Sequence, residues 1–470
     1  MLVALSILLA LILSPATEAD WSRFRGPNGS GLSDTTGLPA EFGPAVNVVW
    51  KTELPQGYSS PVVFANRIFL TGYRGDTLLT FAVDRATGKL LWEKEAPRDR
   101  KEKLDARNHP AAASAATDGT SVFTFFGDYG LLAYDVDGRE LWRRPLGPFN
   151  NIYGMGASPI IVDGLVIMAC DQSTGSFIAA FDAKTGAERW RTARPEAKSG
   201  HSTPIVYKPA SGPTQILLPG SFLLTAYAAD SGKRIWWTGG LSFELKSVPI
   251  IHGDTLFING FGSGENEPGR RVAVAPSADV FAVSDVDKDG KLASAEIPAT
   301  HTQRAISFAD LDNDTQLTVQ EWDYYKAAMD SENGMLAIRL GGSGDMTDKS
   351  IKWTYRRAVP QLPSPIVYRN VLYMVNDGGI VTTLNPDTGA LIQQGRLKGA
   401  IDSYYASPVA ADGKVYMASE KGKVSVLKPD GNLEPIVVND LQEDIYATPA
   451  LVDGRIYLRT RGTLYCFGIR

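Results

Sequence analysis

Cysteine and histidine are scarce in this chain of 470 residues, which has two of the former and four of the latter. Cys170 and Cys466 lie in distant parts of the sequence, which excludes an extracellular disulfide framework and predicts two buried free thiols. The chain has no long basic run of the kind that would indicate a nucleic-acid partner, and its net charge is -5. The histidines lack the His-Glu-x-x-His spacing of a zinc protease; they are His109, His201, His252 and His301.

The N-terminus carries a short apolar run. Residues 1–13 are nearly all apolar, and the following residues 14–19 end in a small-x-small pattern before Asp20. This pattern predicts a signal peptide at residues 1–19, cleaved after Ala19. The run is shorter than the roughly 20 residues of a membrane-spanning helix. No cysteine follows it for lipid modification, so the mature chain is expected to be exported, periplasmic or extracellular, without a transmembrane segment.

A motif of the form Ala-x-Asp-x-x-Thr-Gly-x-x-x-Trp occurs at residues 82–92 and 180–190. Degenerate copies lie at 133–142, 230–236 and 385–389, and the tryptophans are spaced by 50, 48 and 46 residues. In such a turn glycine supplies a positive φ angle, while the Asp and Thr oxygens accept backbone N–H groups. The tryptophan offers a flat surface to a neighbouring repeat. These residues are therefore interpreted as structural.

A second marker, a Ser/Thr-Pro pair or an equivalent, opens a strand in each repeat. Many repeats continue through an Asp-Gly turn into a second strand, and four short strands in about 45 residues are typical of a propeller blade. The last unit lacks its fourth strand, and residues 47–51 carry an unpaired strand with Trp50, which is expected to close the ring. The sequence predicts an all-β, eight-bladed β-propeller with markers near residues 60, 112, 158, 203, 248, 364, 407 and 448.

This arrangement resembles the pyrroloquinoline-quinone-repeat propellers, which include quinoprotein alcohol dehydrogenases and the BamB component of outer-membrane assembly. The resemblance covers most of residues 45–470. The stretch Trp21 to Gly31 is similar to the Trp-x-x-Phe-Arg-Gly-Pro-x-x-x-Gly opening of such propellers exported by planctomycete-like bacteria. The resemblance implies the fold but does not specify a function.

The fifth unit is roughly 70 residues longer than a repeat of about 45 residues, and this excess predicts an insertion there. The expected segments are the N-terminal extension 20–44, propeller residues 45–261 and 334–470, and the insertion 262–333. Within the insertion, residues 285–296 match a twelve-residue EF-hand calcium loop, with glycine at position 6 and a backbone carbonyl at position 7. The predicted ligands are Asp285, Asp287, Asp289, Lys291 and Glu296.

A second acidic loop, residues 310–321, begins 25 residues after the first. It departs from the pattern at position 6, where Thr315 replaces glycine and must adopt a left-handed conformation, so a weaker site is expected. Leu292 and Leu317, at position 8, are expected to pair the loops, with a short linking helix around residues 301–308. The alternative is a pair of solvated acidic turns that bind nothing. The predicted ligands of the second loop are Asp310, Asp312, Asp314, Gln316 and Glu321.

Calcium is the only cofactor that the residues themselves predict. The resemblance implies a quinone held between a tryptophan and a disulfide of adjacent cysteines, but the chain has no adjacent cysteines and no Cys-x-x-Cys-His haem motif. The sequence therefore favours a scaffold or binding protein for an unidentified protein or glycan over a quinone-dependent dehydrogenase. His109 and His201 are expected near a central funnel. Four tyrosines are expected as funnel wall residues: Tyr153, Tyr404, Tyr405 and Tyr446.

Overall fold

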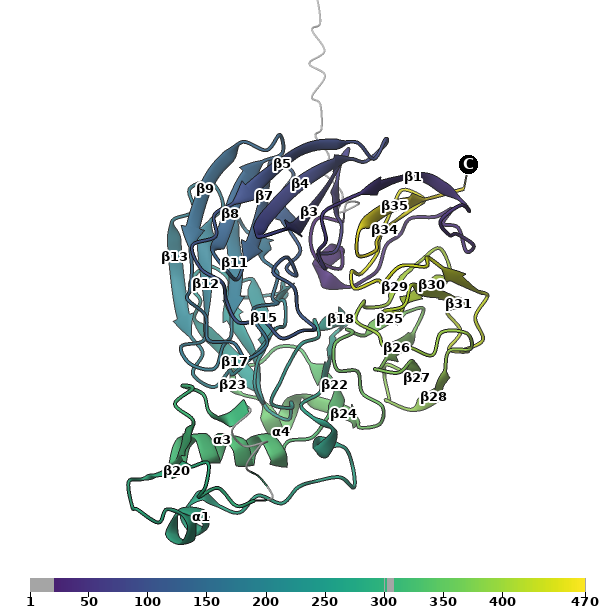
Figure 1. The fold of residues 1–470 in the computed structure, drawn as a ribbon. Helices are drawn as coiled ribbons and strands as arrows, with labels where there is room; N and C mark the ends of the chain where they lie inside the picture. The colour runs from purple at the N-terminus through teal and green to yellow at the C-terminus, as the bar shows by residue number, and fades with distance from the viewer. Residues whose placement is uncertain (1–20, 300, 302–307, 470) are drawn as a thin grey trace, which may run out of the picture.

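The computed structural model describes residues 21–299, 301 and 308–469. Within them, eight mainly antiparallel sheets are arranged in a ring, as the sequence predicts, and an insertion projects from one side of it (Figure 1). The predicted signal peptide lies outside the described residues, as does most of the predicted linking helix at 301–308.

Each blade is a meander of four strands, apart from one added strand in blade four. Blades one and two contain β2 Val62–Phe64, β3 Arg67–Arg74, β4 Thr77–Asp84, β5 Leu90–Ala96, β6 Ala116–Thr117, β7 Ser121–Phe126, β8 Gly130–Asp135 and β9 Glu140–Pro145. Blades three and four contain β10 Ile160–Val162, β11 Leu165–Cys170, β12 Phe177–Asp182, β13 Glu188–Ala193, β14 Ile205–Tyr207, β15 Gln215–Pro219, β16 Leu224–Ala228, β17 Arg234–Thr238 and β23 Gly344–Asp345.

The second half of the ring repeats this pattern. Blades five and six contain β18 Ile250–His252, β19 Thr255–Gly260, β22 Gly334–Arg339, β24 Ile351–Tyr355, β25 Ile366–Tyr368, β26 Val371–Val375, β27 Ile380–Leu384 and β28 Leu391–Arg396. Blades seven and eight contain β29 Val409–Ala411, β30 Lys414–Ala418, β31 Lys423–Leu427, β32 Val437–Asp440, β33 Ala450–Val452, β34 Arg455–Arg459, β35 Thr463–Phe467 and β1 Val48–Glu53. The short first strands, such as β2, β6 and β10, contact one another from blade to blade and therefore line the axis.

Local turn chemistry explains the blade hairpins. Asp163 and Gly164, between β10 and β11, both have positive φ angles of 48° and 77°, the conformation of the tight turns that suit twisted hairpins. Between β12 and β13, the Asp182 carboxylate accepts hydrogen bonds from the Thr185 N–H and hydroxyl, both at 2.9 Å. The predicted roles of the Asp-Gly and Asp-x-x-Thr-Gly sequences are thereby confirmed.

Several of the repeated tryptophans join one blade to the next. Trp142 of blade two donates its indole N–H to the Ala183 carbonyl of blade three at 2.9 Å, and Trp190 repeats the contact with Ala229 of blade four at 3.0 Å. The Trp142 ring covers Gly186, where a Cβ atom would lie 2.6 Å from Trp142 Cδ2. Glycine, which has no Cβ atom, leaves room for this ring, and this explains why the motif contains both glycine and tryptophan. Trp236 differs, because its N–H bonds to Gln215 within its own blade.

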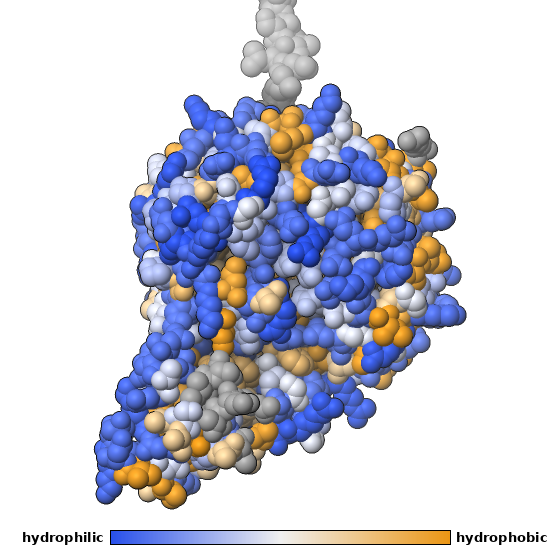
Figure 2. Space-filling view, in the orientation of Figure 1, coloured by the Kyte–Doolittle hydropathy of each residue, from blue (hydrophilic) through white to orange (hydrophobic). Residues whose placement is uncertain are grey.

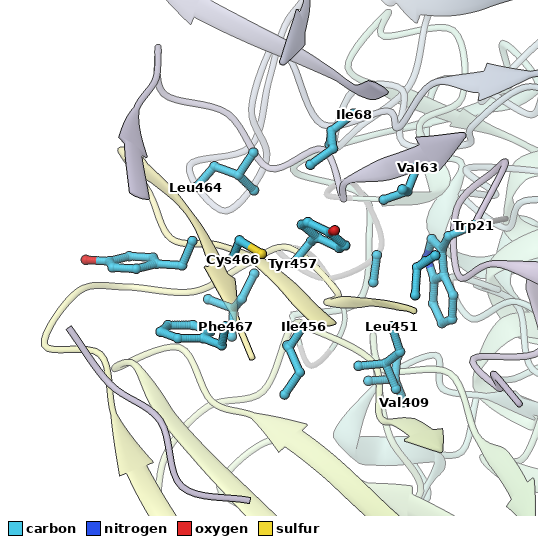
Figure 3. Close-up of a cluster of buried hydrophobic side chains, with 14 of the residues drawn as sticks. Trp21, Val63, Ile68, Val409, Leu451, Ile456, Tyr457, Leu464, Cys466 and Phe467 are labelled. Atoms are coloured by element: carbon cyan, nitrogen blue, oxygen red, sulfur yellow. The ribbon is translucent and has the colours of Figure 1, made fainter. Parts of the chain in front are cut away.

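The N-terminal strand closes the ring. β1 pairs antiparallel with β35, from Val48 opposite Phe467 to Glu53 opposite Thr463. Figure 3 shows the cluster of buried side chains at this closure, where Trp21 and Val63 lie near Leu451 and Val409. β1 thereby supplies the fourth strand of blade eight, as the sequence predicts.

The insertion lies between β19 and β22 of blade five. It contains η2 Gly264–Asn266, α1 Ser277–Ser284, β20 Lys291–Ala293, β21 Gln316–Thr318 and α3 Val319–Asp330. It has its own apolar core around Leu292, Leu317 and Trp322, which also takes in Phe243 of the propeller. A short helix, α4 Thr347–Ser350, follows β23. The insertion is therefore packed against the ring, as Figure 1 shows.

The outer surface is mainly hydrophilic on the face shown in Figure 2, where the insertion extends at the lower left. None of the helices in the described part of the chain combines the length and apolar character needed to cross a bilayer. Cys170 in blade three and Cys466 in blade eight are buried free thiols, as predicted.

Candidate functional site

A ring of hydroxyl side chains surrounds the propeller axis. At most blades the backbone N–H of one marker residue donates to the hydroxyl oxygen of the next, at 2.8–3.0 Å. Val248 of blade five interrupts the ring because it lacks a hydroxyl. The marker of blade two is Ser114, close to the predicted position near residue 112, and no proline follows it. The seven hydroxyls belong to Ser60, Ser114, Ser158, Thr203, Ser364, Ser407 and Thr448.

The hydroxyl hydrogens of this ring are available as hydrogen-bond donors. All seven residues are buried, and none donates its hydroxyl hydrogen to another residue in the described part of the chain. Because each oxygen already accepts a backbone N–H, the unused capacity is mainly that of a donor. The ring therefore presents a set of hydrogen-bond donors to the central cavity that it lines.

The N-terminal segment crosses the inner strands of several blades. The Val63 N–H donates to the Trp21 carbonyl at 2.9 Å, and the Ala410 N–H donates to the Gly31 carbonyl at 2.9 Å. Between these points the Arg25 guanidinium is fully buried and donates to the Pro365 carbonyl at 2.8 Å. Burial lowers the pKa of Arg25 to about 9. Phe24 of the same segment lines the central cavity, so the conspicuous N-terminal motif helps to enclose it.

The central cavity has a volume of about 270 Å³ and is lined by side chains from loops of several blades. Tyr153, Tyr405 and Tyr446 line it, as predicted, and Tyr58 stacks on Tyr446 with ring centroids 4.0 Å apart. Tyr404 does not line it. That ring is completely buried in the core, where its hydroxyl donates to the Ala400 carbonyl at 2.8 Å, because neighbouring residues of an extended segment point to opposite sides.

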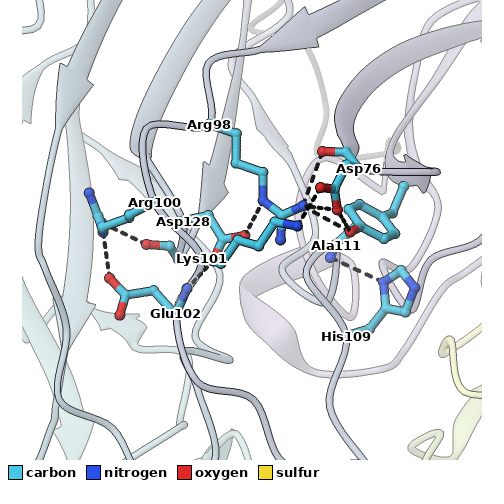
Figure 4. Close-up of polar contacts among 10 residues, drawn as sticks. Asp76, Arg98, Arg100, Lys101, Glu102, His109, Ala111 and Asp128 are labelled. Atoms are coloured by element: carbon cyan, nitrogen blue, oxygen red, sulfur yellow. Dashed lines mark hydrogen bonds and ion pairs between the residues drawn. The ribbon is translucent and has the colours of Figure 1, made fainter.

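A loop between blades one and two brings charged residues to the cavity. Figure 4 shows how Arg98 anchors this loop by an ion pair with the buried Asp128 at 2.7 Å. Farther along, the Arg107 guanidinium donates to both oxygens of Asp105, at 2.7 and 3.1 Å. This hydrogen bonding lowers the pKa of Asp105. The carboxylate and guanidinium therefore reach the cavity as a neutralised pair.

Lys246 enters the cavity from the loop between blades four and five. Its ammonium group pairs with Glu244 at 2.5 Å, and both side chains are buried, with exposed fractions of 7% and 3%. Asp377 lines the same cavity but forms no ion pair with a residue in the described ranges. Desolvation of the Asp377 carboxyl in the cavity wall raises its pKa, while the positive charges of Lys246 and Arg107 lower it. The lining thus contains two paired cations and one unpaired carboxylate.

The two histidines expected near the funnel are placed differently. His201 lines the cavity, and its Nε2 atom has no hydrogen-bond partner among the described residues. Burial, with a contribution from Lys246, lowers its pKa to about 3, so the imidazole is neutral. His109 lies beside the cavity, with its ring 4.8 Å from that of Tyr58, and its Nδ1 accepts the Ala111 N–H at 3.1 Å (Figure 4).

The cavity residues do not fit the quinone site that the resemblance implies. Among the described residues, neither a tryptophan nor a cysteine lines the cavity. The two cysteines are in different blades and are buried in the hydrophobic core. A quinone would therefore find no sandwich of the implied kind here.

The two acidic loops lie side by side in the insertion. β20 and β21 pair antiparallel, with Leu292 opposite Leu317, the contact expected from position 8 of each loop. In the first loop one carboxylate oxygen from each of Asp285, Asp287 and Asp289 lies within 4.8 Å of the others. The second loop brings together Asp310, Asp312 and Glu321 within the same limit.

Hydrogen bonds hold the final glutamates over their loops. Glu296 accepts the N–H groups of Val286 and Ala293, both at 2.9 Å. Glu321 accepts those of Leu311 and Thr318, at 2.8 and 2.9 Å. Glu321 belongs to the second carboxylate cluster, whereas Glu296 lies outside the first cluster. These bonds orient the carboxylates but leave oxygen lone pairs for a cation.

The sixth position of each loop has the same backbone conformation. Gly290 has a φ of 83° and Thr315 a φ of 70°, so Thr315 occupies the left-handed region predicted for it. Asp314 is drawn away from the second cluster, because its carboxylate pairs with the Lys291 ammonium across the two loops at 2.5 Å. Lys291 and Gln316 lie in the paired strands at position 7 of their loops. Burial, and more weakly repulsion from Glu321, raises the pKa of Asp310.

The second loop is docked on the propeller. The Asn150 side-chain amide donates to the Leu311 carbonyl at 2.8 Å and accepts from the Asn313 amide at 2.9 Å. The rings of Phe243 and Phe308 stack with centroids 5.2 Å apart. Phe243 belongs to the same loop as Lys246, so a short segment joins the insertion core to the cavity wall.

Comparison with known proteins identifies the family. The family model described as outer membrane protein assembly factor BamB matches residues 46–177 and 174–469. The chain belongs to this BamB family. BamB-family relatives include the outer membrane protein assembly factors BamB of Shewanella oneidensis and Moranella endobia, each 22% identical. The alignments cover 84% of this chain and 92% of the first relative, and 78% and 84% for the second.

Solved structures show the same propeller fold. BamB from Moraxella catarrhalis has a TM-score of 0.57 and 13% identity, over 90% of this chain and 97% of that one. A europium-containing methanol dehydrogenase has a TM-score of 0.63 and 9% identity, over 97% and 99%. The quinohemoprotein alcohol dehydrogenase ADHIIG from Pseudomonas putida has a TM-score of 0.60 and 11% identity, over 96% and 80%. At these identities the BamB-family fold is shared with proteins of different activities.

Proposed function

We propose that this BamB-family chain is an exported calcium-binding propeller that acts as a scaffold or binding protein for a protein or glycan. The observation that carries the calcium assignment is the convergence of carboxylates in two acidic loops that a short β-pair holds together. The signal-peptide pattern at residues 1–19 supports export. The relatives' description as assembly factors supports a scaffold role.

The chemistry of the loops favours a hard divalent cation. Calcium takes six to eight oxygen ligands, and each loop supplies four carboxylates in twelve residues. Like charges this close repel one another, and a cation bound between them offsets that repulsion. In the first loop the ligands are the carboxylates of Asp285, Asp287, Asp289 and Glu296 and the carbonyl of Lys291. In the second, they are the carboxylates of Asp310, Asp312, Asp314 and Glu321 and the carbonyl of Gln316.

The second site requires one rearrangement. The Lys291 ammonium must release Asp314 before this carboxylate can join Asp310 and Asp312 around calcium. This exchange, together with the left-handed Thr315, predicts weaker binding at the second loop than at the first. Since the second loop docks on Asn150, calcium there would stiffen the contact between insertion and ring. The role is therefore structural.

Isothermal titration of the mature, chelator-stripped protein with calcium tests this proposal. Binding at two sites of unequal affinity is expected. Replacing Asp285 and Glu296 by alanine should remove the stronger one, and Asp310→Ala with Glu321→Ala the weaker. Asp34→Ala with Glu41→Ala removes the same charge outside the insertion and serves as the control. Absence of calcium heat, or equal loss in the control, would refute the assignment.

A further inference from the structure

The central cavity has a combination of groups that points to one class of ligand. Hydroxyl donors, aromatic faces and an unpaired carboxylate meet in a space of about 270 Å³. We propose that it binds a neutral sugar ring, the terminal residue of an oligosaccharide. The inference rests on the binding role proposed above, but it is independent of the calcium loops.

The donors come from the hydroxyl ring. Seven hydroxyl groups line the cavity with protons that no described residue accepts. Buried polar groups are almost always satisfied by a partner, so a ligand or water must supply acceptor oxygens here. The hydroxyl and ring oxygens of a sugar supply several acceptors in one rigid molecule. A hydrocarbon ligand would leave these donors unsatisfied, which is unfavourable for buried polar groups.

The aromatic faces come from the loops above the ring. Tyr58 and Tyr446 stack on each other at 4.0 Å with an interplanar angle of 17°, so they cover one face of each other. Tyr405 is tilted by 53° to Tyr446 at 5.1 Å, and no ring of the described residues stacks on it, so its face is the one offered to a ligand. Glu420 accepts the Tyr446 hydroxyl hydrogen at 3.0 Å and fixes that ring. Aromatic faces carry partial negative charge and attract the weakly positive C–H groups of an apolar surface. A pyranose ring has such a C–H surface together with its hydroxyl groups.

The charges favour a neutral ligand over an ionic one. Arg107 is engaged with Asp105 and Lys246 with Glu244, so neither cation is left for a phosphate or carboxylate. Asp377 would also repel an anion. A cationic ligand would meet Asp377 but also the seven donors and the two basic groups. A sugar hydroxyl, in contrast, donates to the Asp377 carboxylate while its oxygen accepts from a donor.

The size of the cavity defines how much of the ligand is buried. Its volume is slightly below the range of about 300–1,000 Å³ that is typical of small-molecule pockets, which suits a single ring. Arg107 and Asp377 line the cavity and are also exposed to solvent, so the cavity opens to solvent on their side. An oligosaccharide can therefore insert its terminal residue while the remainder extends outward.

A panel of trisaccharides tests the proposal by isothermal titration on calcium-loaded protein. The neutral probes are maltotriose, cellotriose and the N-acetylglucosamine trimer, and the charged ones are the galacturonic acid and glucosamine trimers. We expect at least one neutral probe to bind with a dissociation constant of about 1 mM or below. Tyr405→Ala should weaken it about tenfold, the effect of losing one aromatic contact. Asp377→Ala should weaken it at least as much.

Tyr355→Ala is the matched control, because Tyr355 lies on the outer strand β24 and does not line the cavity. It should leave sugar binding unchanged. Binding of only a charged trimer, binding of none, or equal affinity in wild type and Tyr405→Ala would overturn the sugar assignment. The calcium titration reports separately, so normal calcium heat without sugar binding refutes this inference alone. Sugar binding without calcium heat refutes only the calcium assignment.

Discussion

The contact between Trp142 and Gly186 predicts an unequal effect of two glycine-to-alanine substitutions in blade three. Gly164 and Gly186 both lie in hairpin turns with left-handed φ angles of 77° and 69°. A Cβ atom at Gly164 would meet no atom within 4 Å, whereas one at Gly186 would lie 2.6 Å from Trp142 Cδ2. Both substitutions incur the left-handed strain of roughly 1–2 kcal/mol. Gly186→Ala should cost about 1–3 kcal/mol more, because the tryptophan must also move.

Equilibrium urea denaturation followed by far-ultraviolet circular dichroism measures this difference without relying on tryptophan emission. Gly186→Ala should lower the free energy of unfolding by about 2 kcal/mol more than Gly164→Ala. In a Trp142→Ala background the excess should largely vanish, since the clash is removed. Equal destabilisation by the two substitutions in the wild-type background would refute the view that tryptophan contacts couple the blades.

Two further predictions concern the acidic loops and pH. Thr315→Gly should relieve left-handed strain of about 1–3 kcal/mol and raise calcium affinity at the second loop, measured by titration; unchanged affinity would argue against strain as the cause. Burial, with smaller effects of Arg459 and Arg461, lowers the pKa of His109 to about 4, so the unfolded chain takes up the proton first. Stability should therefore fall between about pH 6.5 and 4. His109→Gln should reduce the slope of urea midpoints over that pH range, leaving the contribution of His201, whose pKa is lowered in the same direction. An unchanged slope would contradict the assignment.

The propeller could be predicted because its signals are local. An Asp-Gly hairpin or an Asp-x-x-Thr-Gly turn is specified by a few adjacent residues, and it recurs once in most blades. The second marker could be placed only approximately, near residue 112, because Ser114 is followed by alanine rather than proline. Its hydroxyl nevertheless takes its place in the ring, at 2.8 Å from the Ser60 N–H nitrogen.

The composition of the central cavity was only partly predictable. Three of its tyrosines were expected, but Tyr404 and Tyr405 could not be separated, because adjacent residues face opposite sides of a segment whose register is set by tertiary packing. Lys246 and Asp377 come from loops of different blades and carry no sequence signature. The acidic loops show the reverse case. Their paired strands were predicted from the leucine at position 8 of each loop, while the ion pair of Lys291 with Asp314 depends on the contact between loops.

The pairing of β1 with β35 means that the ring is sealed by nearly the first and the last described segments of the chain. Contacts between residues this far apart in sequence form late, after most loop-closure entropy has been lost. A chain that stops before residue 463 would leave the edges of β1 and β34 without a partner. Completion of synthesis, and of any passage through a membrane, is therefore coupled to protection of the last exposed strand edges. Partial chains remain vulnerable to aggregation and proteolysis until then.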